Sequence, residues 1–89
     1  MSVLIMIGKG GSINPERVLM IASLKSAPVK RLLKHADPDK VINMTYGYPQ
    51  RSLIIFDTGF MAVTHHETYA LSRAVRQGRE VDYDEALPF

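Results

Sequence analysis

The chain has 89 residues, a length that allows one small domain with a modest hydrophobic core. It contains no cysteine, which excludes disulfides and thiolate metal sites, and no apolar run of 18 residues that could span a membrane. Residues 1–79 hold all 11 Lys and Arg and five acids, whereas residues 80–89 hold four acids and no base. We therefore expect a single basic domain over residues 1–79 and an acidic tail over residues 80–89. The lack of cysteine fits the reducing environment of a cytoplasmic protein. A basic domain attracts nucleic acid or another anion, although the same balance is common on solvated surfaces.

The first quarter of the chain predicts two strands. Apolar runs over residues 3–7 and 18–22 suit strands, and the segments GKGGS and INPER between them contain glycine and Asn-Pro turn signals. GKGGS superficially resembles a phosphate loop but lacks the Walker spacing and does not open a long helix. We interpret it as a strand connection in which Lys9 is a weak candidate for phosphate contact.

A helix is predicted next, from residue 27. Ser26 suits an N-cap, and Pro28 falls in the first turn, where its missing N–H is harmless. Apolar residues recur with helical spacing, and basic residues occupy the other face. The apolar face comprises Val29, Leu32, Leu33 and Ala36, and the basic face comprises Lys30, Arg31, Lys34 and His35.

The second half predicts three strands and a second helix. Residues 41–46, 52–56 and 60–64 suit strands, and the DTG between the last two is a hairpin signal in which Gly59 can take a positive φ. A helix is expected from His65 to a C-cap at Gly78, with an inner stripe of Leu71, Ala74 and Val75 beside Ala70. This order predicts an α+β fold with a small, mostly antiparallel sheet.

The predicted strands are too apolar for a sheet that exposes one face to solvent. The runs VLIMI, VLMIA, LIIF and FMAV do not alternate polar with apolar residues, which indicates burial on both faces. Two amphipathic helices are expected to cover one side of the sheet but hardly both. Either the sheet closes into a small barrel, or other copies of the chain cover the remaining surface, and we favour a homo-oligomer.

The sequence contains no convincing catalytic or metal-binding constellation. His65, His66 and Glu67 form the only cluster of potential metal ligands, but adjacent histidines should diverge and no further ligand stands nearby. We expect a helix-entry segment with ordinary histidines. No serine has a nucleophile-elbow setting. We therefore expect no enzyme activity, no cofactor and no small-molecule substrate.

Basic side chains are the better candidates for function. Arg17 and Arg51 each precede a predicted strand beside a turn, where a guanidinium can be held toward phosphate at little entropic cost. The second helix places Arg73 and Arg76 beside Tyr69. Charged residues on helices are more commonly a solvated face, so the helical arginines are weaker candidates.

A family resemblance adds to this reading. The stretch SAPVKRLLKHA, followed by INMTYG, an arginine and SLIIFDT, is similar to the RemA family, the extracellular matrix regulatory protein A-like proteins of bacteria. The similarity runs from about Val3 to Arg76 and is most specific in SAPVKR and in TYG followed by arginine and aspartate. It implies a cytoplasmic regulator of transcription and biofilm matrix, whose subunits form a ring with double-stranded DNA along a basic rim.

The resemblance also carries over individual residues. Arg17 matches the family's arginine after the first turn, and Arg51 matches the last arginine of the segment after TYG. We expect DNA binding by Arg51 and Arg17, with Lys9 and Arg76 as weaker sites. The family usually has an arginine pair directly after TYG, whereas this chain has Tyr48-Pro49. Each lost phosphate contact lowers the salt dependence of binding by roughly one unit.

Three interpretations of this departure stay open. Arg51 can be the surviving member of a DNA-facing cluster, or the chain can have kept the ring as a structural or protein-binding assembly and changed its ligand. A third interpretation has Tyr46, Tyr48 and Pro49 stack on the bases of a single strand. The same residues also suit a packed, rigid turn.

Overall fold

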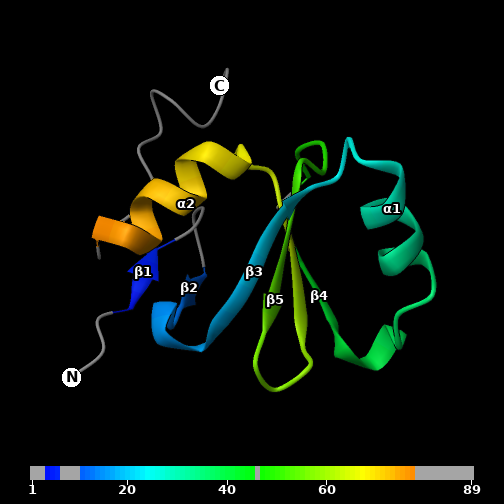
Figure 1. Ribbon diagram of the computed structural model, residues 1–89, viewed down its shortest axis with the longest axis horizontal. Coiled ribbons are helices and arrows are strands. Elements are labelled where there is room, and N and C mark those ends of the chain that lie inside the picture. The colour runs from blue at the N-terminus through cyan, green and yellow to red at the C-terminus, as the bar shows by residue number, and fades with distance from the viewer. Residues whose placement is uncertain (1–3, 7–10, 46, 78–89) are drawn as a thin grey trace.

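The chain folds around an open, four-stranded sheet with a helix on each side (Figure 1). The computed structural model describes residues 4–6, 11–45 and 47–77. Its strands are β1 (Ile5–Met6), β2 (Ser12–Ile13), β3 (Val18–Ser23), β4 (Val41–Met44), β5 (Ser52–Phe56) and β6 (Met61–Thr64). Its helices are α1 (Ala27–Lys34) and α2 (Thr68–Gln77), with short 3-10 turns η1 (Pro15–Arg17) and η2 (Pro38–Lys40). Neither α1 nor α2 has the length and apolar character needed to cross a membrane.

The main sheet has the strand order β3-β5-β6-β4. β5 pairs antiparallel with β3 on one side and with β6 on the other, and β4 runs parallel to β6. β1 and β2 form a separate antiparallel pair next to α2 (Figure 1). The predicted α+β class with a mostly antiparallel sheet is confirmed, whereas the self-closed barrel is wrong because β3 and β4 remain as open edges.

The turn chemistry fixes the β5–β6 hairpin as the sequence predicts. Phe56 N donates to Phe60 O at 2.9 Å, and Gly59 N donates to Phe56 O at 3.0 Å. Gly59 has a φ of 92°, a conformation that residues with a Cβ rarely adopt. The three-residue loop of Asp57, Thr58 and Gly59 therefore sets the register in which Ser52 faces Thr64.

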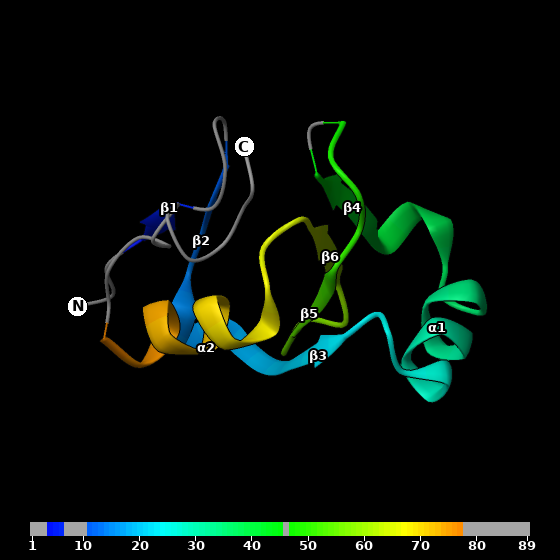
Figure 2. The same ribbon diagram turned by 90° about the horizontal axis from the view of Figure 1, so that it is seen from above.

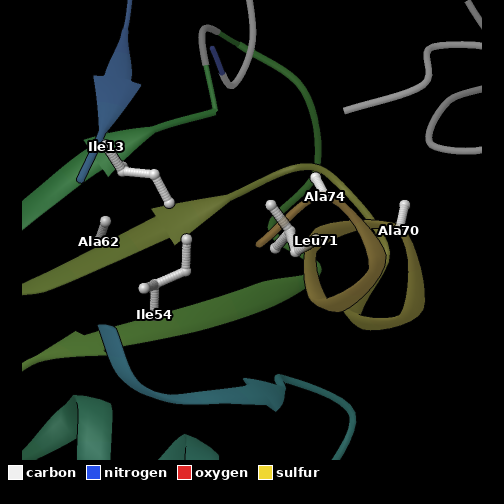
Figure 3. Close-up of a cluster of buried hydrophobic side chains, with 6 residues drawn as sticks. All are labelled: Ile13, Ile54, Ala62, Ala70, Leu71 and Ala74. Carbon is white, nitrogen blue, oxygen red and sulfur yellow. The ribbon is translucent and has the colours of Figure 1, made fainter. Parts of the chain in front are cut away.

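The two helices cover opposite faces of the sheet, which corrects the expectation that both would cover one side. On the α2 face, Ile54 of β5 and Ala62 of β6 pack with Leu71 of α2 (Figure 3). On the α1 face, the alternate residues Leu53 and Val63 pack with Leu24 and with the partly buried Leu33. β5 and β6 are the central strands, so the chain itself buries both faces in the middle of the runs LIIF and FMAV. Phe60, the first residue of FMAV, is 40% exposed.

The remaining exposed apolar surface includes both edges of the sheet. Leu19 and Met20 of β3 are 66% and 42% exposed, and Ile42 of β4 is 49% exposed. The pairing of β3 with β5 shifts register between Val18 and Met20, so Leu19 is an extra residue in a bulge. The bulge explains why the run VLMIA does not alternate. The apolar runs of the sequence therefore leave exposed apolar side chains on β3 and β4, whereas on β5 and β6 the chain itself buries most of them.

Both helices differ in detail from the sequence prediction. α1 has its N-cap at Ser26 and Pro28 in its first turn, as predicted, but Leu32 points to solvent and is 41% exposed. No residue of α1 is buried, since only Val29 and Leu33 reach the core below it. α2 has the predicted inner stripe but begins at Thr68, three residues later than expected. The expected C-cap at Gly78 lies outside the described residues.

Candidate nucleic-acid interface

Arg17 stands at the junction between η1 and β3. Asn14 caps η1, its side chain accepting a hydrogen bond from Glu16 N at 3.0 Å, and the turn ends at Arg17. The Arg17 carbonyl accepts a hydrogen bond from Asp57 N at 2.8 Å, which fixes its backbone to the β5–β6 hairpin. Its guanidinium Nη1 lies 3.1 Å from Asp57 Oδ2, and the side chain is 64% exposed. Arg17 is therefore a solvent-facing cation with one carboxylate partner.

Arg51 stands immediately before β5 and is held more rigidly. Its N–H donates to Thr64 O at 2.8 Å, and its carbonyl accepts from Leu24 N at 2.9 Å, so the backbone is tied to two neighbours. Its Nη1 donates to Glu67 Oε1 at 2.6 Å, and its side chain is 29% exposed. Nε is buried and has no acceptor within hydrogen-bond distance among the described residues. To contact an external anion through Nη1, Arg51 must share or leave Glu67.

The two principal arginines lie at opposite ends of the sheet within one chain. Asp57 is hydrogen-bonded to Arg17 and lies six residues beyond Arg51 along β5. An extended strand rises about 3.3 Å per residue, which places the two backbones about 20 Å apart. The sequence expectation that both arginines stand beside a turn at a sheet end is met, but the fold does not bring them together on one patch of a single subunit.

The structure describes only one of the two weaker candidates for DNA contact. Arg76 lies exposed in the last turn of α2, and Lys9 lies outside the described residues. Arg73 lies beside Tyr69 as expected: its guanidinium carbon is 5.0 Å from the ring centroid, and it donates a hydrogen bond to the Tyr69 hydroxyl. This pair forms a cation–π contact on an exposed face of α2.

His65 and His66 correct the sequence interpretation. They are 1% and 0% exposed, they precede α2, and their ring centroids are 4.2 Å apart, so they stack and do not diverge. Tyr48 packs on His65 with ring centroids 5.1 Å apart. Within residues 4–6, 11–45 and 47–77, no group of three or more His, Asp or Glu residues is placed to hold a metal ion. The pair lies in the interior beside Tyr48, and His65 is close enough to Arg51 for that charge to act on its pKa.

Burial keeps the two histidines neutral. It lowers the pKa of His66 to about 4, with a further lowering by neighbouring His65. Burial also lowers the pKa of His65, and the positive charge of Arg51 acts in the same direction, while a backbone hydrogen bond to Met44 opposes both. Arg51 therefore sits beside uncharged imidazoles at neutral pH, so that Glu67 is the charged group it contacts.

The segment between β4 and β5 is a packed turn around Tyr48. Tyr48 N donates to Thr45 O at 3.0 Å, and Gly47 takes a φ of 91° between them. The half-buried Tyr48 ring lies against His65, whereas Pro49 is exposed and Tyr46 lies outside the described residues. This geometry favours the rigid-turn interpretation of the segment over a stacking platform.

Comparison with known proteins decides the family. Residues 4–74 match the RemA-like family, described as extracellular matrix regulatory protein A-like. The chain belongs to the RemA-like family. Three of its relatives carry the name "Putative regulatory protein": those of Clostridium novyi, Clostridium beijerinckii and Acaryochloris marina. The first is 32% identical over 92% of both chains, and the second is 34% identical over 92% of this chain and 94% of the relative. The third is 39% identical over 68% of this chain and 70% of the relative.

Sequence reasoning missed the carboxylates of this RemA-like chain. Asp57 and Glu67 pair with Arg17 and Arg51, but they lie 40 and 16 residues away in the sequence. For Asp57 a signal existed, because an antiparallel β3–β5 pair that begins at Val18 and ends at Phe56 brings the two neighbouring residues together. For Glu67 no local pattern indicates the contact, since it depends on the path of the chain between β6 and α2.

Proposed function

We propose that this RemA-like chain is a cytoplasmic regulator of transcription that binds double-stranded DNA as a homo-oligomeric ring. Membership of a family whose relatives are named regulatory proteins is the observation that carries the proposal. The fold supports it by holding Arg17 and Arg51 at rigid strand ends, where guanidinium groups reach solvent.

The sheet edges support assembly of identical copies. β3 and β4 are unlike edges, and both expose apolar side chains, namely Leu19, Met20 and Ile42. Exposed apolar edge strands are templates for pairing with another chain. A contact between the β3 edge of one copy and the β4 edge of the next is head-to-tail, and such contacts generate closed rings when the rotation closes. We therefore place the subunit interface on these edges.

A ring increases the number of arginines that can contact one DNA molecule. The Arg17 and Arg51 backbones lie about 20 Å apart in one chain, so a single subunit presents two separate single arginines. Repetition around a ring places equivalent arginines on a common rim, and each subunit that contacts a phosphate adds one released counterion. Avidity then supplies an affinity that no single subunit has.

A second candidate function is a structural or protein-binding ring without DNA. The observation that favours it is that both arginines already have carboxylate partners, at 3.1 Å for Arg17 and 2.6 Å for Arg51. The chain also has Tyr48-Pro49 after TYG, where the resemblance leads one to expect an arginine pair. Phosphate must compete with Asp57 and Glu67, so DNA binding requires an exchange of partners.

Arg51→Ala separates the two functions. We expect the variant to bind a labelled DNA duplex more weakly than the native chain, with a smaller salt dependence, while its native mass stays unchanged. Lys40→Ala is the matched control, since Lys40 is an exposed cation outside the candidate set. Equal duplex binding by native chain and Arg51→Ala across a salt titration contradicts the DNA function and leaves the second candidate. A single-stranded oligonucleotide in parallel tests the single-strand interpretation.

A further inference from the structure

A basic pocket lies between α1 and the residues that lead into β5. It is an open cavity of about 310 Å³ lined by Leu24, Lys30, Leu33, Lys34 and Gln50. Leu24 comes from the turn between β3 and α1, the lysines and Leu33 come from α1, and Gln50 precedes Arg51. Figures 1 and 2 show α1 on the side of the sheet away from α2, so a pocket lined by α1 residues lies away from α2.

The pocket has an apolar floor and a cationic wall. Leu24 is 7% exposed and belongs to the core cluster of Leu53 and Val63, and Leu33 packs against that cluster. Lys30 and Lys34 lie one helical turn apart, which places their Cβ atoms about 5–6 Å from each other on one face of α1. Gln50 stands among the same lining residues and supplies an amide that can both donate and accept.

The two lysines differ from the principal arginines in their electrostatic surroundings. Arg17 and Arg51 each have a carboxylate partner, whereas neither Lys30 nor Lys34 has a carboxylate oxygen within 4.0 Å in the part of the chain that the structure describes. α1 itself contains no acid, and no acid lines the pocket. Two ammonium groups without counter-charge beside an apolar floor attract an anion that also carries an apolar or planar part.

We propose that this pocket binds a small phosphorylated organic molecule of mononucleotide size. Lys30 and Lys34 hold the phosphate, Leu24 and Leu33 lie under the ring, and Gln50 hydrogen-bonds to a polar edge of the ligand. The volume of about 310 Å³ lies at the lower end of the range for small-molecule sites, about 300–1,000 Å³, which fits a ligand of mononucleotide size. The ligand acts as an effector, since the pocket adjoins the hydrogen bond from Leu24 N to Arg51 O. Ligand binding at this pocket does not require that the chain binds DNA.

The location gives the ligand access to the backbone that positions Arg51. Leu24 N donates to Arg51 O at 2.9 Å, and Gln50 is the residue before Arg51. A ligand that contacts Leu24 and Gln50 therefore touches residues on both sides of this hydrogen bond.

Adenosine 5′-monophosphate is the probe, with adenosine and inorganic phosphate as separate arms and no DNA present. We expect saturable NMR shifts at the Gln50 side-chain amide and at the Leu24 and Leu33 backbone amides. Inorganic phosphate and adenosine are each expected to bind at least about tenfold more weakly, because each supplies one half of the recognised chemistry. Equal binding of inorganic phosphate and the nucleotide, or no saturation by the nucleotide, overturns the proposal.

The double variant Lys30→Gln, Lys34→Gln tests the assignment to these side chains. Both lysines are exposed, so the variant keeps the core intact, and nucleotide affinity is expected to fall at least about tenfold. Lys25→Gln is the control, because Lys25 is an exposed lysine that does not line the cavity. An equal loss in the control, or a double variant that weakens duplex binding as strongly as Arg51→Ala while nucleotide binding is unchanged, rejects the pocket and assigns the lysines elsewhere.

Discussion

At the residue scale, the central feature is that Arg17 and Arg51, the two principal candidates for DNA contact, are each paired with one carboxylate. Arg51 is the more buried of the two, and its contact to Glu67 is the shorter. Partly exposed ion pairs of this kind contribute little to stability, about 0–1 kcal/mol. In the proposed DNA function their larger effect is on binding, because a phosphate oxygen would have to displace Glu67 from Nη1 or share that donor with it.

Glu67→Gln is therefore expected to strengthen DNA binding. The amide keeps the size of the side chain but removes the charge that competes with phosphate, and we expect a gain of about fivefold in duplex affinity, the equivalent of about 1 kcal/mol. Fluorescence anisotropy with a labelled duplex at low salt measures it. Asp39→Asn is the control, since it removes one exposed negative charge away from any arginine of the candidate set. If both variants gain equally, net charge accounts for the effect and the competition by Glu67 is rejected.

The buried histidines predict a loss of stability in acid. The pKa of His66 falls from its ordinary value of 6.5 to about 4 on folding, so the unfolded chain takes up the proton first as the pH falls. The contribution is fully present above pH 6.5 and is lost progressively as the pH falls from 6.5 to 4. The free energy of unfolding should decrease by about 3 kcal/mol over this range from His66 alone.

His66→Gln isolates that contribution. Denaturant unfolding at pH 7 and pH 4 should give a smaller difference in the variant than in the native chain, whatever the absolute stability of the variant. His35→Gln changes an exposed histidine and should leave the difference as it is. Identical differences in the native chain and in His66→Gln are incompatible with a buried, neutral His66.

At the element scale, the apolar side chains of the central strands β5 and β6 are mostly buried within the chain, whereas those of the edge strands β3 and β4 are partly exposed. Leu53 and Ile54 of β5 are both 0% exposed although they point to opposite faces, because α1 covers one face and α2 the other. Neither α1 nor α2 covers Leu19 and Met20 of β3 or Ile42 of β4 in this way, and all three stay exposed. The expected role of a neighbouring subunit is therefore confined to the edges.

A pair of leucine variants distinguishes the edge from the core. Leu19→Asp places a charge on the exposed bulge of β3 and is expected to dissociate the oligomer while the subunit keeps its far-UV circular dichroism. Leu53→Ala creates a cavity in the core and is expected to destabilise the fold by about 2–5 kcal/mol without a specific effect on subunit contacts. Sedimentation velocity and denaturant unfolding measure the two effects.

The control for Leu19→Asp is Thr58→Asp, which adds the same charge to the exposed β5–β6 turn. It should leave the native mass unchanged. An intact oligomer in Leu19→Asp removes β3 from the interface.

Local signals predicted the elements well, because they depend on neighbouring residues. DTG gave the β5–β6 hairpin, Pro28 gave the start of α1, and the spacing of Leu71 and Ala74 gave the inner face of α2. Long-range arrangement was not accessible in the same way. The placement of the helices on opposite faces, the bulge at Leu19 and the stacking of His65 on His66 all depend on strand register and on the chain path between elements.

The sequence predicted the local positions of the candidate site residues but not their long-range contacts. The position of Arg17 and Arg51 at strand ends follows from the turns that precede them, whereas their carboxylate partners and their separation of about 20 Å follow from strand pairing. The pocket beside α1 had no signal in the sequence, because its walls come from three segments that meet only in the fold.

At the scale of the whole molecule, we propose that identical subunits assemble and together bind one anionic ligand, double-stranded DNA. One subunit has two arginines about 20 Å apart and two sheet edges with exposed apolar side chains. We propose that joining copies through the edges buries the apolar side chains and repeats the arginines around a common axis. The acidic tail over residues 80–89, which lies outside the described residues, is proposed as a separate segment beyond the basic domain.

Sedimentation of the native protein with a labelled DNA duplex, at about 50 and 200 mM salt, tests this account most directly. We predict a species several times the 10.0 kDa mass of one chain that carries the duplex at the lower salt concentration. For four phosphate contacts, duplex affinity should fall by about a hundredfold at the higher concentration, while the protein assembly persists. A stable 10.0 kDa species, or an assembly that leaves the duplex free at both salt concentrations, contradicts the account.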